Sequence, residues 1–256
     1  MIDNLTLKKL ADGIGIDSFS VLREAVQIAF LNELFSLPES QEVFFKGGTA
    51  IKLMTGSNRF SEDLDFTVGT EKLKLGQLAV KAADRLKKQF PGIILKDIES
   101  LAGISKKIWL PTDISTQPLT VKLDFSFREK VLRPKQGVIK TELPVAATTL
   151  INYVDPSEML AEKYRAILTR TKGRDLYDVW YLLNRKIAFE PKLVKQKLDY
   201  YKEKYEPKRF IDKIKRWPEK NIIEDVRRFL PRRDREMLTK LKSLVLEAIR
   251  DSNLLS

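Results

Sequence analysis

Two aspartates separated by a single residue, Asp63 and Asp65, form the pair whose type and spacing could most readily do chemistry. Apolar and polar residues alternate from position 63 to 68, which predicts a strand with both carboxylates on its polar face. Alpha carbons two residues apart on a strand are about 6.5 Å apart, so the side chains could share one cation or bracket two. Asp124, on the polar face of a later predicted strand, would supply a third ligand. Three converging carboxylates repel one another unless a divalent ion neutralises them, so the pattern favours a metal site over three solvated acids.

The chain contains no cysteine and no histidine. Their absence excludes disulfides, thiolate catalysis and zinc bound by sulfur or imidazole. A metal here must be a hard cation held by oxygen, and Mg²⁺ fits best. The lack of cysteine makes the reducing cytoplasm the simplest compartment. The N-terminus does not read as a signal peptide and the longest apolar runs fall well short of the ~18 residues of a spanning helix, so we expect no membrane.

A pair of glycines precedes these acids in the sequence. Gly47 and Gly48, followed by Thr49, stand between a predicted short strand at 42–45 and a predicted short helix at 49–54. Backbone N–H groups at such a junction could bind phosphate oxygens, with the positive end of the helix behind them. A Gly-Gly pair is usually only a turn, so this interpretation depends on the acids that follow it.

The periodicity of apolar residues divides the chain into two parts. Up to about residue 150 it predicts helices at 18–35 and 71–90, and strands at 93–98, 104–110 and 119–127. Beyond that point it predicts helices only, at 156–171, 175–184, 192–217 with a break at Pro207, and 233–251. The predicted fold class is α+β, with a small mixed sheet and flanking helices in a domain 1–150 and a helical domain 151–256.

Two charged positions in the second part do not fit their predicted surroundings. Lys163 interrupts the apolar face of the helix at 156–171. Its ammonium either passes the apolar surface to reach water or serves to neutralise phosphate. Arg174 and Asp175 open the next helix, where Asp175 would also suit an N-cap. The residues alone leave these alternatives open.

These motifs resemble those of a known family. The runs KGGTA at 46–50 and RFSEDLDF at 59–66 are similar to the nucleotide-binding signature of AbiEii/AbiGii-type toxins, nucleotidyltransferases related to the DNA polymerase β superfamily. The segment from Glu158 to Lys163, then Arg170 and RDLYD at 174–178, is similar to the later motif of that family. The resemblance covers about residues 44–183.

The resemblance implies a polymerase-β-like palm and assigns roles to particular residues. Asp63 and Asp65 would be catalytic metal ligands for Mg²⁺, with Asp124 as the third acid. Lys163 and Asp175 would also be required for catalysis. The residues implied to lie near the triphosphate or to fix its loop are Gly47, Gly48, Thr49, Arg59, Ser61 and Arg174.

The charge balance suggests what accepts the nucleotide. A net charge of +12 favours a polyanionic partner. Basic residues dominate from 186 to 216 and are interspersed with aromatic ones, a pattern that suits binding of the RNA backbone and stacking of unpaired bases. A solvated basic helix face whose aromatic residues lie in the core would give the same pattern. The aromatic residues are Tyr200, Tyr201, Tyr205 and Phe210.

Relatives in the family that the motifs resemble extend or block tRNA 3′ ends. The resemblance therefore implies nucleotide transfer from a nucleoside triphosphate to RNA, in particular tRNA, with translation blocked and a cognate antitoxin as partner. One alternative is an enzyme of the same fold that modifies a protein or a small molecule. Another is a non-catalytic homologue that binds nucleic acid.

Overall fold

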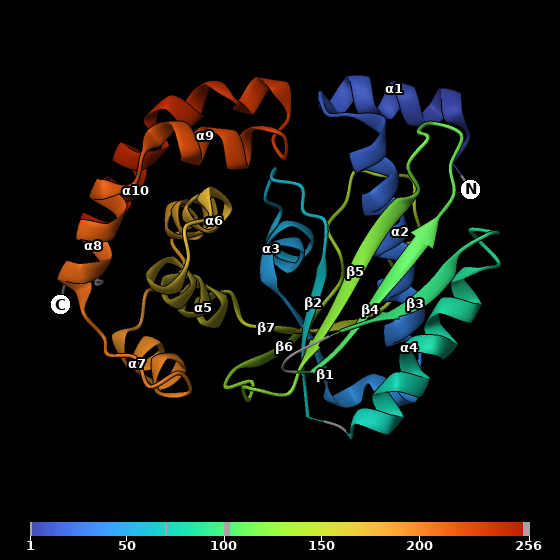
Figure 1. Ribbon diagram of the computed structural model, residues 1–256, viewed down its shortest axis with the longest axis horizontal. Helices are drawn as coiled ribbons and strands as arrows, with labels where there is room; N and C mark the ends of the chain where they lie inside the picture. The colour runs from blue at the N-terminus through green and yellow to red at the C-terminus, as the bar shows by residue number, and fades with distance from the viewer. Residues whose placement is uncertain (1, 70, 100–102, 253–256) are drawn as a thin grey trace. The chain divides into compact units, whose positions relative to one another are not determined.

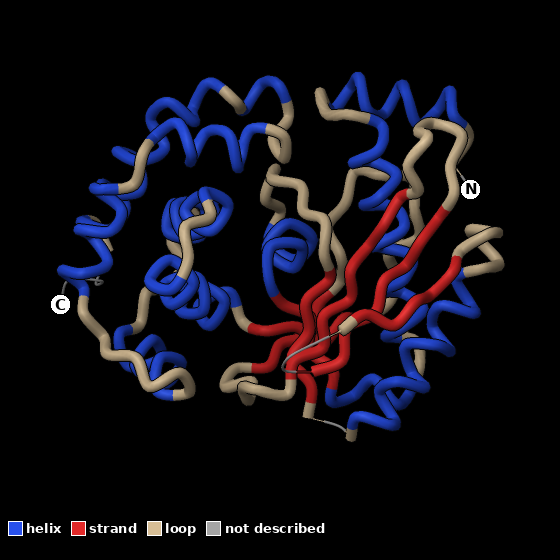
Figure 2. Tube along the Cα trace, viewed as in Figure 1, coloured by secondary structure: helices blue, strands red, loops and turns tan. Residues whose placement is uncertain are grey.

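The computed structural model describes residues 2–69, 71–99 and 103–252 and divides into two compact units, Met1–Val154 and Asp155–Ser256 (Figure 1). Each unit is built around its own core. The predicted α+β class is confirmed, because strands and helices share the first unit and helices make up the second (Figure 2).

The first unit is organised by a mixed sheet, whose seven described strands run in the order β3-β4-β5-β2-β1-β7-β6. The pairs β2/β5 and β1/β7 are parallel and the other neighbours are antiparallel. The strands are β1 (Val43–Lys46), β2 (Leu64–Val68), β3 (Ile94–Ile98), β4 (Gly103–Leu110), β5 (Leu119–Ser126), β6 (Pro134–Gly137) and β7 (Ile151–Val154). The helices are α1 (Asn4–Ile14), α2 (Ser18–Phe35), η1 (Pro38–Glu42), α3 (Gly47–Thr55) and α4 (Lys72–Leu86).

Aromatic stacking fixes one face of this sheet as the core. Phe66 on β2 stacks on Phe125 of β5 with ring centroids 4.7 Å apart, and Phe45 on β1 lies 5.7 Å from Phe66. Phe35 from α2 also packs against Phe66. Each such buried side chain contributes about 1.5–3 kcal/mol. Because strand side chains alternate, the opposite face of β2 and β5 is left for polar residues.

Several boundaries in this unit differ from the sequence predictions. Helix α3 begins at Gly47 rather than at Thr49, so the two glycines form its first turn instead of a break. The prediction that strands stop near residue 150 is wrong, because β7 follows at Ile151–Val154. It pairs with β1 through a register that places Phe45 opposite Tyr153. Strand β6 was missed because its four residues carry little periodic signal. Helix α1 was also missed, although Leu7 and Ala11 mark one buried face over its 11 residues.

The second unit is helical. Its helices are α5 (Pro156–Thr169), α6 (Gly173–Asn184), α7 (Pro191–Asp199), α8 (Pro207–Arg216), α9 (Glu219–Arg227), the short η2 (Arg232–Asp234) and η3 (Glu236–Lys240), and α10 (Leu241–Arg250). The sequence prediction missed α9 and began the last helix too early, at 233. No helix among the described residues is long and apolar enough to cross a membrane.

Aromatic residues of the basic segment contribute to the core of this unit. Tyr164 on α5 stacks on Phe210 of α8 with centroids 4.2 Å apart, and Tyr205 lies 5.5 Å from Tyr164. Phe210 has no exposed surface. Of the two alternatives that the sequence left open for these aromatics, the core therefore holds for Phe210, whereas Tyr205 is half-buried at its edge.

Close packing explains why α6 starts with a glycine. A Cβ added at Gly173 would come within 2.7 Å of the backbone oxygen of Ile222 on α9. This early start also moves Asp175 inside the first turn of α6, where it is only 2% exposed. The expectation that Asp175 caps the helix is thus corrected, and its carboxylate is available to neighbouring side chains.

A buried ion pair joins α5 to α7. Lys197 is fully buried, and its Nζ lies 2.6 Å from Oε1 of Glu158, which is also fully buried. A second carboxylate, Glu162, lies 3.1 Å from the same ammonium. The pair fixes the helix that carries Lys163.

Replacing this lysine should destabilise the second unit. The Lys197→Met variant leaves the Glu158 charge buried without its partner, which costs about 3–5 kcal/mol. Urea denaturation of the full chain measures the change. The control is Lys192→Met on the exposed side of α7, which should change stability by less than about 0.5 kcal/mol. Equal stabilities for the two variants would contradict the structural role of the pair.

Candidate active site

The register of three strands brings the predicted acids onto neighbouring positions. Strand β2 pairs with β5 so that Asp65 stands beside Asp124, and it pairs with β1 so that Asp65 stands opposite Lys46. Asp63 immediately precedes β2. All three carboxylate residues are half-buried, on the side of the sheet away from the phenylalanine stack.

Asp124 is held by two neighbours on the same face. Its carboxylate accepts a hydrogen bond from the hydroxyl of Ser105 on β4 and lies 2.5 Å from Nζ of Lys122. Partial burial lowers the pKa of Lys122, but the hydrogen bond and charge of Asp124, with the charges of Asp63 and Asp65, outweigh it and raise that pKa overall. Lys122 therefore lies in the field of all three acids.

The donor atoms suit Mg²⁺ supplied with a nucleotide. Within the described parts of the chain, no three acidic side chains are grouped closely enough to hold a metal ion by themselves. Mg²⁺ sites commonly use one or two protein carboxylates and complete the shell with water and substrate phosphates. Asp63 and Asp65 offer such a pair of hard oxygen donors, so the residues fit this ion.

The surrounding side chains leave little room for a Cβ at either residue of the glycine pair. Gly47 has φ of 80°, and a Cβ there would collide with the carboxylate of Asp65. A Cβ on Gly48 would collide with the guanidinium of Arg59 and come within 3.1 Å of Ser61 Oγ. The first turn of α3 thus lies directly against the acid pair, with its backbone N–H groups at the positive end of the helix.

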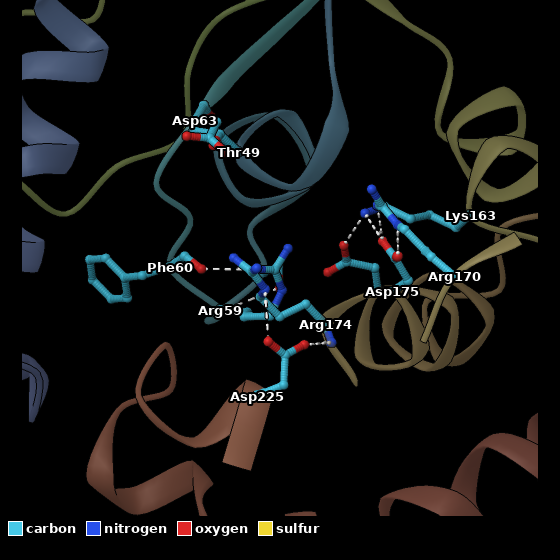
Figure 3. Close-up of polar contacts among 11 residues, drawn as sticks. Thr49, Arg59, Phe60, Asp63, Lys163, Arg170, Arg174, Asp175 and Asp225 are labelled. Atoms are coloured by element: carbon cyan, nitrogen blue, oxygen red, sulfur yellow. Dashed lines mark hydrogen bonds and ion pairs between the residues drawn. The ribbon is translucent and has the colours of Figure 1, made fainter. Parts of the chain in front are cut away.

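The loop between α3 and β2 is tied down by polar contacts (Figure 3). Arg59 is buried and donates from Nη1 to the backbone oxygen of Phe60 at 2.9 Å. Gln27 donates to the backbone oxygen of Ser61 at 3.1 Å. The Thr49 hydroxyl donates to the backbone oxygen of Asp63. Thr49 and Arg59 thus position the acid loop, and the roles in nucleotide binding predicted for them stay predictions.

A second group of charged residues lies within the helical unit (Figure 3). Lys163 on α5 has its Nζ 2.8 Å from Oδ1 of Asp175 and 2.7 Å from Oδ2 of Asp178, both on α6. Arg170 contacts Asp175 from the other side, with Nε and Nη2 at 2.7 and 2.9 Å from its two oxygens. The lysine that interrupts an apolar face is thus explained by two buried carboxylates.

Asp178 completes this group, although sequence reasoning did not select it as a site residue. It is fully buried. The available signal was its position three residues after Asp175, because residues three apart share a helix face. Burial alone would raise the pKa of Asp175, but the ammonium of Lys163 and the guanidinium of Arg170 lower it overall, well below its usual range.

Arg174 has its own partner in the helical unit. Its backbone N–H donates to Oδ2 of Asp225 on α9 at 3.1 Å, and its Nε lies 3.4 Å from Oδ1. The guanidinium also lies over the ring of Phe229, 4.6 Å from its centroid. These contacts position Arg174, and the role in substrate binding predicted for it stays a prediction.

Carboxylates beside a glycine turn at a helix N-terminus supply the donors that a nucleotide and its metal ion require, and the family comparison gives the class of protein. Residues 29–249 match the family described as "Nucleotidyl transferase AbiEii toxin, Type IV TA system". This match spans most of the chain, so the protein belongs to the AbiEii family, and the resemblance read from its motifs is confirmed. Membership implies a nucleoside triphosphate substrate and a cognate antitoxin. No curated protein matches the sequence.

Solved structures with low sequence identity share the fold. MenT4, a nucleotidyltransferase toxin of Mycobacterium tuberculosis H37Rv, aligns with a TM-score of 0.64 and 16% identity over 98% of this chain and 93% of its own. JHP933 from Helicobacter pylori aligns with a TM-score of 0.55 and 22% identity, over 92% of this chain and 94% of its own. A structure described as a putative nucleotidyltransferase from H. pylori aligns with a TM-score of 0.54 and 22% identity, over 94% of this chain and 99% of its own.

The glycine turn gives a first test of the site. Gly47→Ala should lower nucleotide transfer by about 100-fold or more, because the new methyl group must displace the Asp65 carboxylate. The forced positive φ should also cost about 1–2 kcal/mol. The matched control is Gly76→Ala in α4, where a Cβ meets nothing within 4 Å. Activity of Gly47→Ala equal to that of the control would contradict the proposed contact.

The charged helical group gives a test by pH. Folding lowers the pKa of Asp175, so this residue stabilises the folded chain above its unfolded pKa of about 3.9, and the contribution is lost as pH falls through the lower folded value. Asp175→Asn should therefore cost about 3 kcal/mol at pH 7 and at pH 5, with the cost shrinking only below about pH 4.

Urea denaturation at these pH values measures the difference between wild type and variant. Asp84→Asn is the control, because its carboxylate forms an exposed surface pair with Lys87. A cost for Asp175→Asn that already disappears between pH 7 and pH 5 would show that the Asp175 carboxylate is not held ionised by Lys163 and Arg170.

Proposed function

We propose that this toxin transfers a nucleotide from a nucleoside triphosphate to RNA, most specifically to the 3′ end of tRNA, in the cytoplasm, and so blocks translation. The observation that carries the proposal is the acid pair of β2 packed against the glycine turn of α3. It combines oxygen donors for Mg²⁺ with backbone donors for phosphate oxygens, which are the two requirements for binding a triphosphate.

The sheet residues divide the work of binding. Asp63 and Asp65 would hold Mg²⁺, which when bound neutralises charge on the triphosphate and stabilises the charge that develops during transfer. The N–H groups at Gly47 and Gly48 bind phosphate oxygens, and the buried Arg59 keeps the loop over them in place. Fixing the substrate in this way supplies much of the rate, since phosphoryl transfer depends on positioning and electrostatics.

The chemical step needs one proton acceptor. The acceptor hydroxyl of RNA attacks the α-phosphorus, a new ester bond forms, and the bond from the α-phosphorus to the bridging oxygen of the β-phosphate breaks, releasing pyrophosphate. The hydroxyl proton passes to a carboxylate, because the chain has no histidine. We assign this role to Asp124, which the sequence also predicted as a third metal ligand; Ser105 and Lys122 hold its orientation.

Lys163 and Asp175 serve the same reaction in our proposal. The ammonium of Lys163 offsets negative charge on the phosphates, and the buried carboxylates of Asp175 and Asp178 fix its position beforehand. A lysine fixed in this way loses little rotamer entropy when it binds substrate.

Charge supports RNA as the acceptor. The net charge of +12 favours a polyanion, and counterion release would add to the affinity. An RNA acceptor also explains the dense basic sequence of the helical unit better than a small-molecule acceptor, which needs no extended positive surface.

Label transfer tests the proposal. The purified chain is incubated with Mg²⁺, total tRNA and each α-³²P-labelled nucleoside triphosphate in turn, and RNA and protein are resolved on denaturing gels. We expect label on tRNA, at least about 100-fold weaker in Asp63→Asn and absent with EDTA. Asp84→Asn is the charge-matched control and should retain full transfer. Label on protein alone would overturn RNA as the acceptor, and transfer by Asp63→Asn at the rate of the control would overturn the catalytic assignment.

A further inference from the structure

A large basic pocket in the helical unit takes no part in the reaction described above. Its volume is about 830 Å³, within the range typical of ligand sites. The end of α5, helix α8 and the turn that follows α8 form its walls. Its cationic residues are Lys208, Arg209, Lys213 and Arg216, and its acidic residues are Glu206 and Asp212.

Lys213 is the fixed cation of this pocket. Its Nζ donates to the backbone oxygen of Leu168 at 3.0 Å, which holds the ammonium at the wall. Burial, followed by repulsion from Arg209, lowers the pKa of Lys213. The positive charge is therefore poorly compensated in the free protein, and an anion in the pocket would stabilise it.

Three of the four cations are not neutralised by a carboxylate. Arg209 pairs with Glu203 at 3.3 Å. Across the described ranges of the chain, Lys208, Lys213 and Arg216 form no ion pair within 4.0 Å. The pocket thus keeps a net positive charge that is available to a ligand.

The position of the pocket links it to the charged helical group. Leu168 and Thr171, which line it, stand on either side of Arg170 in the sequence, and Arg170 binds Asp175. An anion bound here would lie next to the segment that positions Asp175 and, through it, Lys163.

We propose that this pocket binds a backbone phosphate of the RNA acceptor, an inference that rests on the proposed function. RNA phosphates provide the single negative charges that three uncompensated cations would attract. The aromatic wall residue Trp217 is only 4% exposed, so it offers no face for base stacking. Recognition by the pocket should therefore be independent of sequence, positioning the RNA without reading it.

Fluorescence anisotropy of the full chain with end-labelled total tRNA, at several KCl concentrations and without nucleoside triphosphate, tests this. The double variant Lys213→Gln with Arg216→Gln should bind at least about 10-fold more weakly and show a salt slope smaller by roughly 1–2. The control carries Lys192→Gln with Lys220→Gln, two exposed lysines outside the pocket, and loses the same charge. It should weaken binding by less than about 3-fold.

A single variant and a competition experiment complete the test. Arg216→Gln alone avoids the Leu168 contact, so a loss of affinity there cannot come from misfolding at Lys213. Equal affinity of the pocket and control double variants would overturn the inference. So would polyglutamate that competes as well as RNA at equal charge, since it would mark a surface for an acidic protein.

Failure of the pocket and failure of the proposed function are separable. If wild type labels tRNA but the pocket variants bind RNA like the control, only the pocket assignment is wrong. If the pocket variants lose RNA affinity as predicted but wild type labels no RNA, the pocket stands as an RNA site and the proposed reaction is wrong.

Discussion

The packing of β1, β2 and β5 on one face of the sheet is the constraint on which the candidate site of the first unit depends. Asp65 stands beside Asp124 across parallel strands, and Asp63 is only two residues away. Stacked phenylalanines pack the other face of the same strands, so the core fixes the backbone positions from which these acids project. Lys122 lies in the field of these acids, which raises its pKa, and Mg²⁺ bound with a nucleotide would add further positive charge beside them.

Crowding beside the acids explains the glycine turn. A triphosphate at this site must reach both the acids and the backbone N–H groups of α3. The residues of that turn must therefore lie close to neighbouring side chains, which leaves little room for a Cβ. At Gly47 the Asp65 carboxylate occupies the space of a Cβ, and at Gly48 the guanidinium of Arg59 does. The helical unit handles charge differently: the buried carboxylates of Asp175 and Asp178 hold the ammonium of Lys163 and so fix a cation before any substrate arrives.

Much of this was accessible from the sequence. Alternation along β2 and β5 placed the acids correctly on the polar face, because one buried face imposes a period of two. The family followed from motif order and spacing. Interactions between distant residues were not accessible: the contact of Lys163 with Asp178 depends on how α5 packs on α6, and the start of α6 at Gly173 depends on the backbone of Ile222. Strand β7 was missed because its four residues carry no distinctive period.

The central claim is that Asp63 and Asp65 hold a divalent ion together with a triphosphate at the first turn of α3. A crystal structure of the full chain with Mn²⁺ and a non-hydrolysable nucleoside triphosphate analogue tests it most directly, because Mn²⁺ gives an anomalous signal at the metal position. We predict a peak within direct coordination distance of oxygens of both aspartates and of the phosphates, with the phosphates against the N–H groups of Gly47 and Gly48. A triphosphate and metal bound elsewhere, with these aspartates uncoordinated, would contradict the account.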